Sequence, residues 1–344
     1  MARLVYTKEE ILSDHPGLKP HIEAGYTLHG GIDAAGNYVS PRMLHRAPAV
    51  DAWVEALAAR GWDLIDASGD LLKRENYPNQ AQAAFLLQNG EEKTLWNSLT
   101  TTGIIEARGQ ALADFPPPDF QEIIVEDISD TATGHLAKGL LIAHGWDEGG
   151  EPGSGHGAHD AMWFAARDAL FGKEAYPLVE PPESIGKPDL GREMPDLPEM
   201  HEALLRLLMD VLMIEVRAEA FFNHCCNLMR NPALFTDRRT EADLAANLVD
   251  RIRQDEDIHV GYLQVVLSEL RSFTFKLKDS STKPGHEILD PVWDRMVAWH
   301  STTVFDERRV QTREDILARV RALPGGEELA NQFDALDKAQ LAAE

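Results

Sequence analysis

The sequence has few cysteines, no long hydrophobic run and no excess of positive charge. Its two cysteines, Cys225 and Cys226, are adjacent in the chain, which is a poor placement for an ordinary structural disulfide. Nowhere do about 18 uninterrupted apolar residues suggest a membrane span, and the first residues lack the basic stretch and the apolar run of a secretory signal. We therefore expect a cytoplasmic protein in a reducing compartment.

The charge balance excludes further classes of partner. The chain carries 57 acidic residues against 33 lysines and arginines, and its net charge of −24 repels phosphate backbones and anionic lipid surfaces. The Gly-Ser-Gly segment at residues 153–155 also lacks the Gly-Lys-Ser/Thr ending of a phosphate-binding loop. We therefore expect neither nucleic acid nor a membrane as a partner. A neutral or cationic ligand, or a metal ion, fits this charge better.

What the sequence does have is apolar material in helical periodicity. With 44% hydrophobic and 26% charged residues, the chain can bury a globular core. Apolar spacing of about 3.6 residues predicts an all-α fold with an irregular N-terminal cap and extra C-terminal helices. We divide the chain into the cap (1–75), a helical bundle (76–310) that contains the proline-rich linker 177–198, and a C-terminal helix and tail (311–344).

Two pairs of helices make up the expected bundle. In the second pair, a long apolar helix over residues 200–230 is stopped by an Asn-Pro sequence, and its partner spans residues 240–273. In the first pair, a helix over residues 94–114 is stopped by three prolines, and an aspartate then caps a helix expected over residues 119–146. The connections are short, so we expect the helices of each pair to be antiparallel neighbours.

Glu256 and His259 are the strongest candidates for metal ligands. Residues three apart on a helix project from neighbouring faces, so this pair can direct a carboxylate oxygen and an imidazole nitrogen at one ion. Antiparallel pairing with the preceding helix brings Glu215 level with them, and Glu219 lies one turn further on. Carboxylates in a low-dielectric core repel one another unless a proton or a cation lies between them. A metal ion is the simplest explanation.

The first helix pair offers a less complete set of ligands. The same arithmetic places Glu106 level with about position 127, so that Asp127 and Asp130 face it. His135 lies two turns further along and reaches the same ion only if the second helix starts later or is kinked. A lone histidine such as His135 is more often a hydrogen-bonded core residue.

Two antiparallel helix pairs, each offering a buried glutamate followed by Glu-x-x-His, resemble the ferritin-like di-iron carboxylate superfamily. The resemblance covers about residues 94–273, where the second pair matches the pattern and the first lacks its histidine. It implies a ferritin-like helical bundle with a dinuclear metal site. The metal ligands that we assign from it are Glu106, Asp127, His135, Glu215, Glu219, Glu256 and His259.

The resemblance also implies a chemistry. It points to two iron ions, or iron and manganese, that activate dioxygen to oxidise a small organic substrate. Met209, Met213, Phe221 and Phe222 are candidates to line the substrate pocket. An electron donor is then a further expected partner, and because symmetric pairs are common we expect a homodimer. The same imidazole and carboxylate ligands also suit zinc.

Three other interpretations stay open at this point. A heme-oxygenase-like di-iron oxidase is also all-α, and it would use a different order of ligands along three helices. A non-catalytic helical binding protein would hold the same acids in salt bridges, for example Glu215 and Glu219 with arginines of the facing helix. His144, His156 and His159 would form a separate zinc site at the Gly-rich loop.

Overall fold

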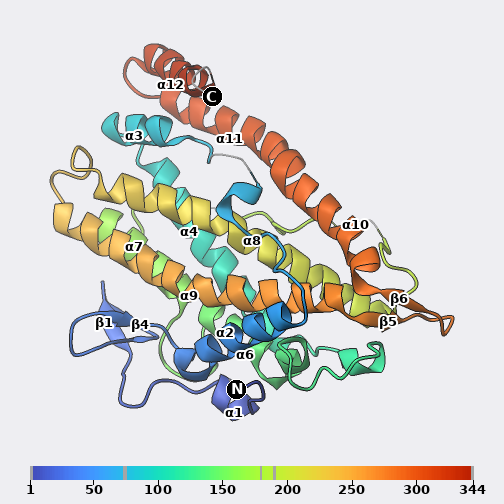
Figure 1. Ribbon diagram of the computed structural model, residues 1–344. Helices are drawn as coiled ribbons and strands as arrows, with labels where there is room; N and C mark the ends of the chain where they lie inside the picture. Colours follow the sequence, from blue (N-terminus) through green and yellow to red (C-terminus); the bar gives the residue numbers. More distant parts are fainter. Residues whose placement is uncertain (1–2, 73–75, 179, 189–190, 342–344) are drawn as a thin grey trace.

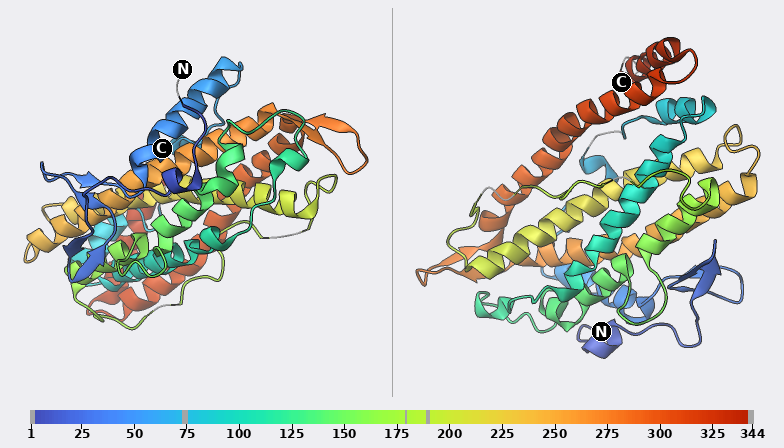
Figure 2. Two further views of the ribbon diagram at one scale, coloured as in Figure 1. Left: turned by 90° about the horizontal axis from the view of Figure 1, so that it is seen from below. Right: turned by 180° about the vertical axis from the view of Figure 1, so that it is seen from behind.

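The computed structural model describes residues 3–72, 76–178, 180–188 and 191–341. Over these residues the chain is mostly helical, with short two-stranded hairpins, which confirms the all-α class. Figure 1 shows α8 and α9 side by side, and the view from behind in Figure 2 shows α4 and α7 lying across them. None of the described helices is both long enough and apolar enough to cross a bilayer. These central helices are α4 (Lys93–Gly109), α7 (His159–Phe171), α8 (Glu199–Arg230) and α9 (Arg239–Ser272).

The pair formed by α8 and α9 confirms the two long helices expected near residues 200–230 and 240–273. Each helix buries an apolar stripe along its length, which is the pattern that packs one helix on another. α8 ends where Asn231 leaves the helical conformation before a proline, and the short connection turns α9 back along α8. The described residues of the proline-rich segment 177–198 form neither helix nor strand.

The expected helix over residues 119–146 is wrong. It contains two short 3-10 helices, η2 (Phe120–Glu122) and η3 (Thr133–Lys138), separated by turns and irregular backbone, and only α6 (Leu140–Gly149) is an α-helix. Side chains in between hydrogen-bond their own backbone: the Asp127 carboxylate accepts from the Ser129 amide at 2.9 Å. Such local bonds compete with helical ones. Gly139, at φ +111°, then adopts a left-handed conformation that separates η3 from α6.

The helices before this segment follow the sequence pattern. α3 (Gln80–Gln88) starts with a capping box at Asn79, and α4 and α5 (Ala111–Asp114) follow before the three prolines. α6 then packs closely on α4 and α5 through two glycines on one of its faces. A Cβ at Gly145 would lie 2.5 Å from the Ala113 amide nitrogen, and one at Gly149 would lie 2.7 Å from a backbone oxygen of α4. This close approach brings α6 against the central helices.

The N-terminal segment lies against the central helices. It contains two antiparallel hairpins, and the second turns at an Ala-Gly-Asn sequence and places Gly31 opposite Val39. The His29 amide donates to the Gly157 carbonyl at 2.8 Å, and so joins this segment to the loop before α7. α2 packs along α9. The elements are α1 (Lys8–Ile11), β1 (His21–Glu23), β2 (Tyr26–Leu28), β3 (Gly31–Ile32), β4 (Tyr38–Val39), α2 (Met43–Ala59) and the 3-10 helix η1 (Gly69–Leu71).

The C-terminal helices form an arm that runs obliquely across the molecule (Figure 1). The expected tail is in fact a further helix, α12, and Phe333 on it is fully buried against α3 and α11. The sequence pattern missed this helix because its apolar positions are few. The elements are β5 (Thr274–Lys276), β6 (Thr282–Pro284), α10 (Gly285–Ala298), the π-helical segment η4 (Trp299–Thr303), α11 (Val304–Arg321) and α12 (Gly326–Leu341).

Two large apolar clusters meet along α8 and α9. One contains α8 residues up to Val216 and α9 residues from Ile258 onward, while the other contains α8 residues from Phe222 onward and α9 residues up to Ile252. Close to the point where the clusters meet, Glu215 on α8 and Asp255, Glu256 and His259 on α9 are buried as well. The middle of the bundle is therefore a polar layer enclosed by apolar packing.

We predict that Gly145→Ala destabilises the protein by about 1 to 3 kcal/mol, because the added Cβ would lie 2.5 Å from backbone that cannot move independently. Urea unfolding followed by circular dichroism measures the free energy of unfolding. Gly261→Ala is the matched control, since that helical glycine faces only a Val50 methyl group at 3.3 Å. The control should change stability by less than about 1 kcal/mol. An equal loss in both variants would contradict the close packing of α6.

Candidate metal centre

The polar layer holds seven buried side chains, four glutamates and three histidines, in two groups of four that share one glutamate. They come from five helices that are far apart in sequence. In each group, one ligand atom per residue lies within 4.8 Å of the others. The residues are Glu106 on α4, His144 and Glu148 on α6, His159 on α7, Glu215 on α8, and Glu256 and His259 on α9.

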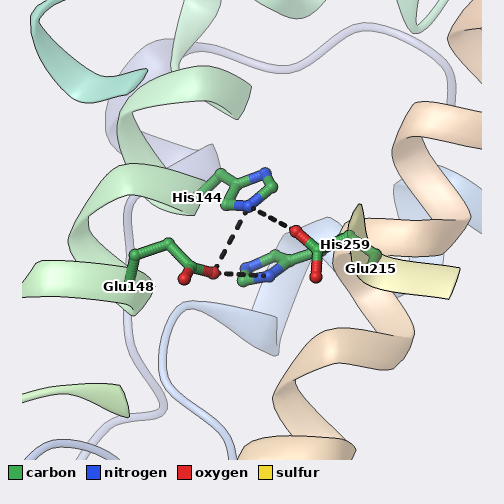
Figure 3. A group of neighbouring side chains, drawn as sticks. All are labelled: His144, Glu148, Glu215 and His259. Atoms are coloured by element: carbon green, nitrogen blue, oxygen red, sulfur yellow. Dashed lines mark ion pairs between the residues drawn. The ribbon is translucent and has the colours of Figure 1, made fainter. Parts of the chain in front are cut away.

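The first group is His144, Glu148, Glu215 and His259 (Figure 3). The His144 Nε2 atom lies 3.3 Å from Glu148 Oε1 and 3.2 Å from Glu215 Oε1. The His259 Nδ1 atom lies 3.2 Å from the same Glu148 oxygen. The two imidazoles are stacked, with ring centroids 3.8 Å apart. Each of the four side chains therefore points a nitrogen or oxygen atom that can bind a metal toward the other three.

The second group is Glu106, Glu148, His159 and Glu256. The His159 Nδ1 atom lies 3.1 Å from Glu256 Oε1, 3.6 Å from Glu148 Oε1 and 3.9 Å from Glu106 Oε2. The other Glu256 oxygen lies 2.6 Å from His259 Nδ1 in the first group. Glu148 and Glu256 therefore lie between the two groups, each in contact with histidines of both.

Each of the three histidines has its second ring nitrogen held outside the cluster by a hydrogen-bonding partner. Fixing one imidazole nitrogen in this way orients the ring and leaves the other nitrogen free to bind a metal. The outer partners are the Tyr262 hydroxyl for His144 Nδ1 at 2.7 Å, Asp255 for His159 Nε2 at 3.2 Å and Asp147 for His259 Nε2 at 3.1 Å.

Asp147 is itself held by two buried arginines from the N-terminal part of the chain. Arg42 donates to it from Nε at 3.0 Å and from Nη2, and Arg46 donates from Nη2 at 2.6 Å. Burial alone would raise the pKa of Asp147, but the two guanidinium groups lower it well below its usual value. The orientation of His259 thus depends on a charged network that α2 supplies.

Asp255 has a similar set of partners. The Tyr38 hydroxyl donates to it at 2.8 Å, and His29 Nε2 lies 3.4 Å away. Both residues belong to the hairpin segment near the N-terminus, so this segment fixes the ring of His159 through Asp255. On the other side of the cluster, the Trp163 indole N–H donates to Glu106 Oε1 at 3.2 Å.

The electrostatics of the cluster favour a bound cation. Burial, followed by the charge of Glu148, raises the pKa of Glu106 well above its usual value, and burial with repulsion from Glu256 raises the pKa of Glu215 to about 7. Burial would lower the pKa of His259, but the surrounding carboxylates outweigh it and raise the pKa to about 10. The carboxylates therefore require protons or metal ions between them.

Several inward-facing atoms have no hydrogen-bond partner among the described residues, although they are fully buried. They are His144 Nε2, Glu148 Oε1 and His159 Nδ1. Buried polar atoms are nearly always paired, and an unpaired one costs free energy. The outer nitrogens of the same histidines are satisfied, so the unpaired atoms are those that face the middle of each group. Their chemistry fits a metal ion there.

Four of the residues assigned from the sequence come together in this cluster, namely Glu106, Glu215, Glu256 and His259. Glu256 and His259 are buried, although charged residues surround them in the sequence. Glu215 faces His144 and, among the residues that the structure describes, makes no salt bridge to an arginine. The antiparallel pairing of α8 and α9 is the reason, because it brings these positions to the same level.

Three assigned residues lie elsewhere. Asp127 is exposed on the irregular segment that replaces the expected helix. His135 is buried but belongs to a different part of the core, where its Nε2 accepts from the Tyr6 amide at 3.0 Å. Glu219 lies one turn beyond Glu215 and points outward, where it forms an ion pair with Arg253 at 2.8 Å. The structure therefore places none of the three in the cluster.

His144, Glu148 and His159 belong to this site but were not among the ligands assigned from the sequence. The alternative of a separate zinc site formed by His144, His156 and His159 is not supported, because His144 and His159 join the glutamates and His156 stays outside both groups. His144 and Glu148 are four apart on α6, a spacing that puts both on one helix face. The helix expected over 119–146 ended before Glu148, so the sequence pattern did not place this pair on one helix.

Comparison of the chain with models of protein families, with curated proteins and with solved structures finds no match. The interpretation of the cluster therefore depends on its own geometry.

We predict that Glu219→Ala lowers the free energy of unfolding by less than about 1 kcal/mol, because its ion pair with Arg253 is exposed to solvent. Arg253 also keeps Asp250 as a partner at 3.2 Å. Urea unfolding of wild type and variant tests this. A loss of several kcal/mol would mean that Glu219 is part of the buried cluster after all.

Asp147→Asn should be far more damaging, with a loss of about 3 to 5 kcal/mol, because Arg42 and Arg46 would remain buried without their charged partner. The same unfolding measurement applies. The matched control is Asp290→Asn, which removes the partner of Arg271 in a half-exposed ion pair and should cost less than about 1 kcal/mol. Equal losses in the two variants would show that the Asp147 network contributes nothing special.

Proposed function

We propose that this protein is a dinuclear metal-dependent oxidoreductase that uses two iron ions, or iron and manganese, with dioxygen to oxidise a small organic substrate. The observation that carries the proposal is the orientation of three buried histidines. Each has an outer nitrogen fixed by a hydrogen bond and an inner nitrogen directed at buried glutamates. Metal-binding histidines have this arrangement, in which the outer partner sets the tautomer and the ring orientation.

The charges of the cluster suit two divalent ions. Four glutamates carry four negative charges when ionised, and two divalent cations would balance them while the three histidines stay neutral. No arginine or lysine among the described residues forms a salt bridge with these glutamates. A purely structural salt-bridge network, which a non-catalytic binding protein would require, is therefore not supported. The carboxylate-rich set favours iron or manganese over zinc.

The proposed ligand sets follow the two groups. His144, Glu215 and His259 would hold one ion, and Glu106 and His159 would hold the other. Glu148 and Glu256 lie between the groups and are the candidates to contact both ions. When bound, such a pair of ions supplies dioxygen activation for oxidation of a nearby substrate.

The arrangement of helices supports a ferritin-like site more than a heme-oxygenase-like one. α8 supplies Glu215, and α9 supplies Glu256 and His259 at the Glu-x-x-His spacing, as the ferritin-like pattern requires. The other half departs from that pattern, because His144 and Glu148 on α6 and His159 on α7 replace its second Glu-x-x-His. A heme-oxygenase-like site would take its ligands from three helices, whereas the candidate ligands of this protein come from five.

A cavity of about 410 Å³ beside the cluster supports an enzyme rather than a storage or structural site. Glu106 is part of its wall, so a molecule in the cavity would lie next to a proposed ligand. Phe222 lines the same wall and packs against Trp163, whose indole N–H holds Glu106. These aromatic side chains would exclude water from that side of the cluster and keep the Glu106 carboxylate in place. Of the four pocket candidates from the sequence, Phe221 and Phe222 line this cavity, whereas Met209 and Met213 are core residues.

Metal analysis of the purified protein tests the proposal. Iron, manganese and zinc are measured per chain, before and after aerobic incubation with ferrous iron and removal of the excess. We expect about two iron or manganese ions per wild-type chain. Glu256→Ala and His259→Ala should each lose more than half of this metal, because each removes a donor from the centre of the cluster.

Glu219→Ala is the matched control, since it removes a glutamate from the same helix pair outside the cluster, and its metal content should equal that of the wild type. Circular dichroism checks that each variant is folded. A wild-type protein that stays metal-free after incubation with ferrous iron would overturn the proposal. Binding of zinc alone would overturn the redox function while leaving a metal site.

A further inference from the structure

The cavity beside the cluster is bounded by α4, α8 and α11, and also by residues outside these helices, namely Gly69, Leu72, Asn76, Tyr77 and Ile185. Its α4 wall runs from Asn97 to Glu106, with lining residues at positions 97, 98, 101, 102, 105 and 106, which form one face of the helix. At about 1.5 Å per residue this face is about 13 Å long. The cavity is therefore an elongated space with the proposed metal centre at its Glu106 end.

The α8 wall of the cavity is largely apolar, and Val304 and Phe305 of α11 extend it, whereas the α4 lining residues apart from Ile105 are polar. Phe221 and Phe222 contribute from α8, and Phe305 contributes from α11, with aliphatic side chains between them. Such a lining binds the hydrocarbon or aromatic body of a ligand by the hydrophobic effect. The first residues of α11 form one side of the cavity, so the C-terminal arm helps to shape it.

The end far from Glu106 carries hydrogen-bond donors. Arg309 and Tyr77 both line the cavity, and the Arg309 guanidinium lies 4.7 Å from the Tyr77 ring centroid. The Tyr77 hydroxyl is buried and has no hydrogen-bond partner among the described residues, and the same is true of Asn97 Oδ1. Arg309 binds both Asp337 oxygens through its Nη2 atom alone, at 2.6 Å each. Its other donors are not used in that ion pair.

The charge of the cavity is opposite to that of the whole chain. The chain has 57 acidic and 33 basic residues, but the ionised lining residues described are Arg217, Arg309 and the proposed metal ligand Glu106. The net charge of the chain predicts a neutral or cationic ligand. The cavity wall instead contains guanidinium groups, and although Arg309 pairs with Asp337 through Nη2, a guanidinium has further donors that can bind a carboxylate.

We propose that the cavity binds an amphipathic organic carboxylate, with its carboxylate at Arg309 and Tyr77 and its apolar body packed against the phenylalanines of α8 and α11 on the way to Glu106. The end of the ligand that reacts is inferred from the proposed function, on which this part of the inference rests. The way in which the ligand binds depends on the cavity alone. The apolar end of the acid is then the part presented to the metal centre. A substrate oxidised at that end keeps its carboxylate bound.

Isothermal titration calorimetry with octanoate, octylamine and octan-1-ol tests the substrate class. These probes share an apolar chain and differ in the charge of the head group. The full-length protein is titrated both as purified and after incubation with ferrous iron. We expect octanoate to bind at least about tenfold more tightly than either of the other probes, because charge-assisted hydrogen bonds to arginine are worth that much or more.

Arg309→Gln should weaken octanoate binding about tenfold or more, and Tyr77→Phe should weaken it several-fold without the loss of a charge. Arg313→Gln is the matched control: Arg313 forms the neighbouring ion pair between α11 and α12, to Asp334 at 2.5 Å, but does not line the cavity. It should leave the affinity for octanoate unchanged. Both arginine variants remove one ion pair of the arm, so a general loosening of the arm affects them equally.

Octylamine binding as tightly as octanoate, or equal effects of Arg309→Gln and Arg313→Gln, would overturn the inference. Metal content is measured on the same samples. A protein that holds two metal ions but does not bind octanoate would overturn the substrate class and leave the proposed function standing. A protein that binds octanoate through Arg309 but takes up no metal would overturn the proposed function and leave the ligand class of the cavity standing.

Discussion

Mutual repulsion among buried carboxylates is the constraint on which this structure depends. Glu106, Glu148, Glu215 and Glu256 lie within a few ångströms of three histidines, in the layer where two apolar clusters meet along α8 and α9. Removing charged groups from water costs several kcal/mol for each ion, and apolar side chains above and below leave no solvent to screen them. Such a layer persists only if protons or cations lie between the acids, which is why a metal centre explains it best.

The rest of the molecule is arranged to hold this layer in place. Arg42 and Arg46 of the N-terminal part fix Asp147, and Asp147 orients His259. Tyr38 binds Asp255, which orients His159. The irregular N-terminal segment is therefore more than a cover for the bundle, because it sets the direction of two imidazole rings. Close packing at the α6 glycines serves the same end by bringing His144 and Glu148 to the central helices.

The cavity beside the cluster shows how local structure overrides total composition. A strongly acidic chain discourages anionic partners at its surface, since the field of many charges is summed there. Inside the cavity, the side chains that line it are the ones a ligand contacts, and Arg217 and Arg309 are among them. Helix α11, which the sequence assigned to the bundle's edge and the tail, supplies one of these arginines and closes the space.

The sequence by itself determined the helical class, the two long helices α8 and α9, and the half of the site that lies on them. Those inferences needed only periodicity, helix stops and the rise per residue, which act over short distances along the chain. Only the tertiary structure decided the other half. It replaced Asp127, His135 and Glu219 with His144, Glu148 and His159: turn-forming hydrogen bonds broke the helix expected over 119–146, and Glu219 points outward to Arg253. Which side chains meet across five helices depends on packing between segments distant in sequence, and no local pattern records that.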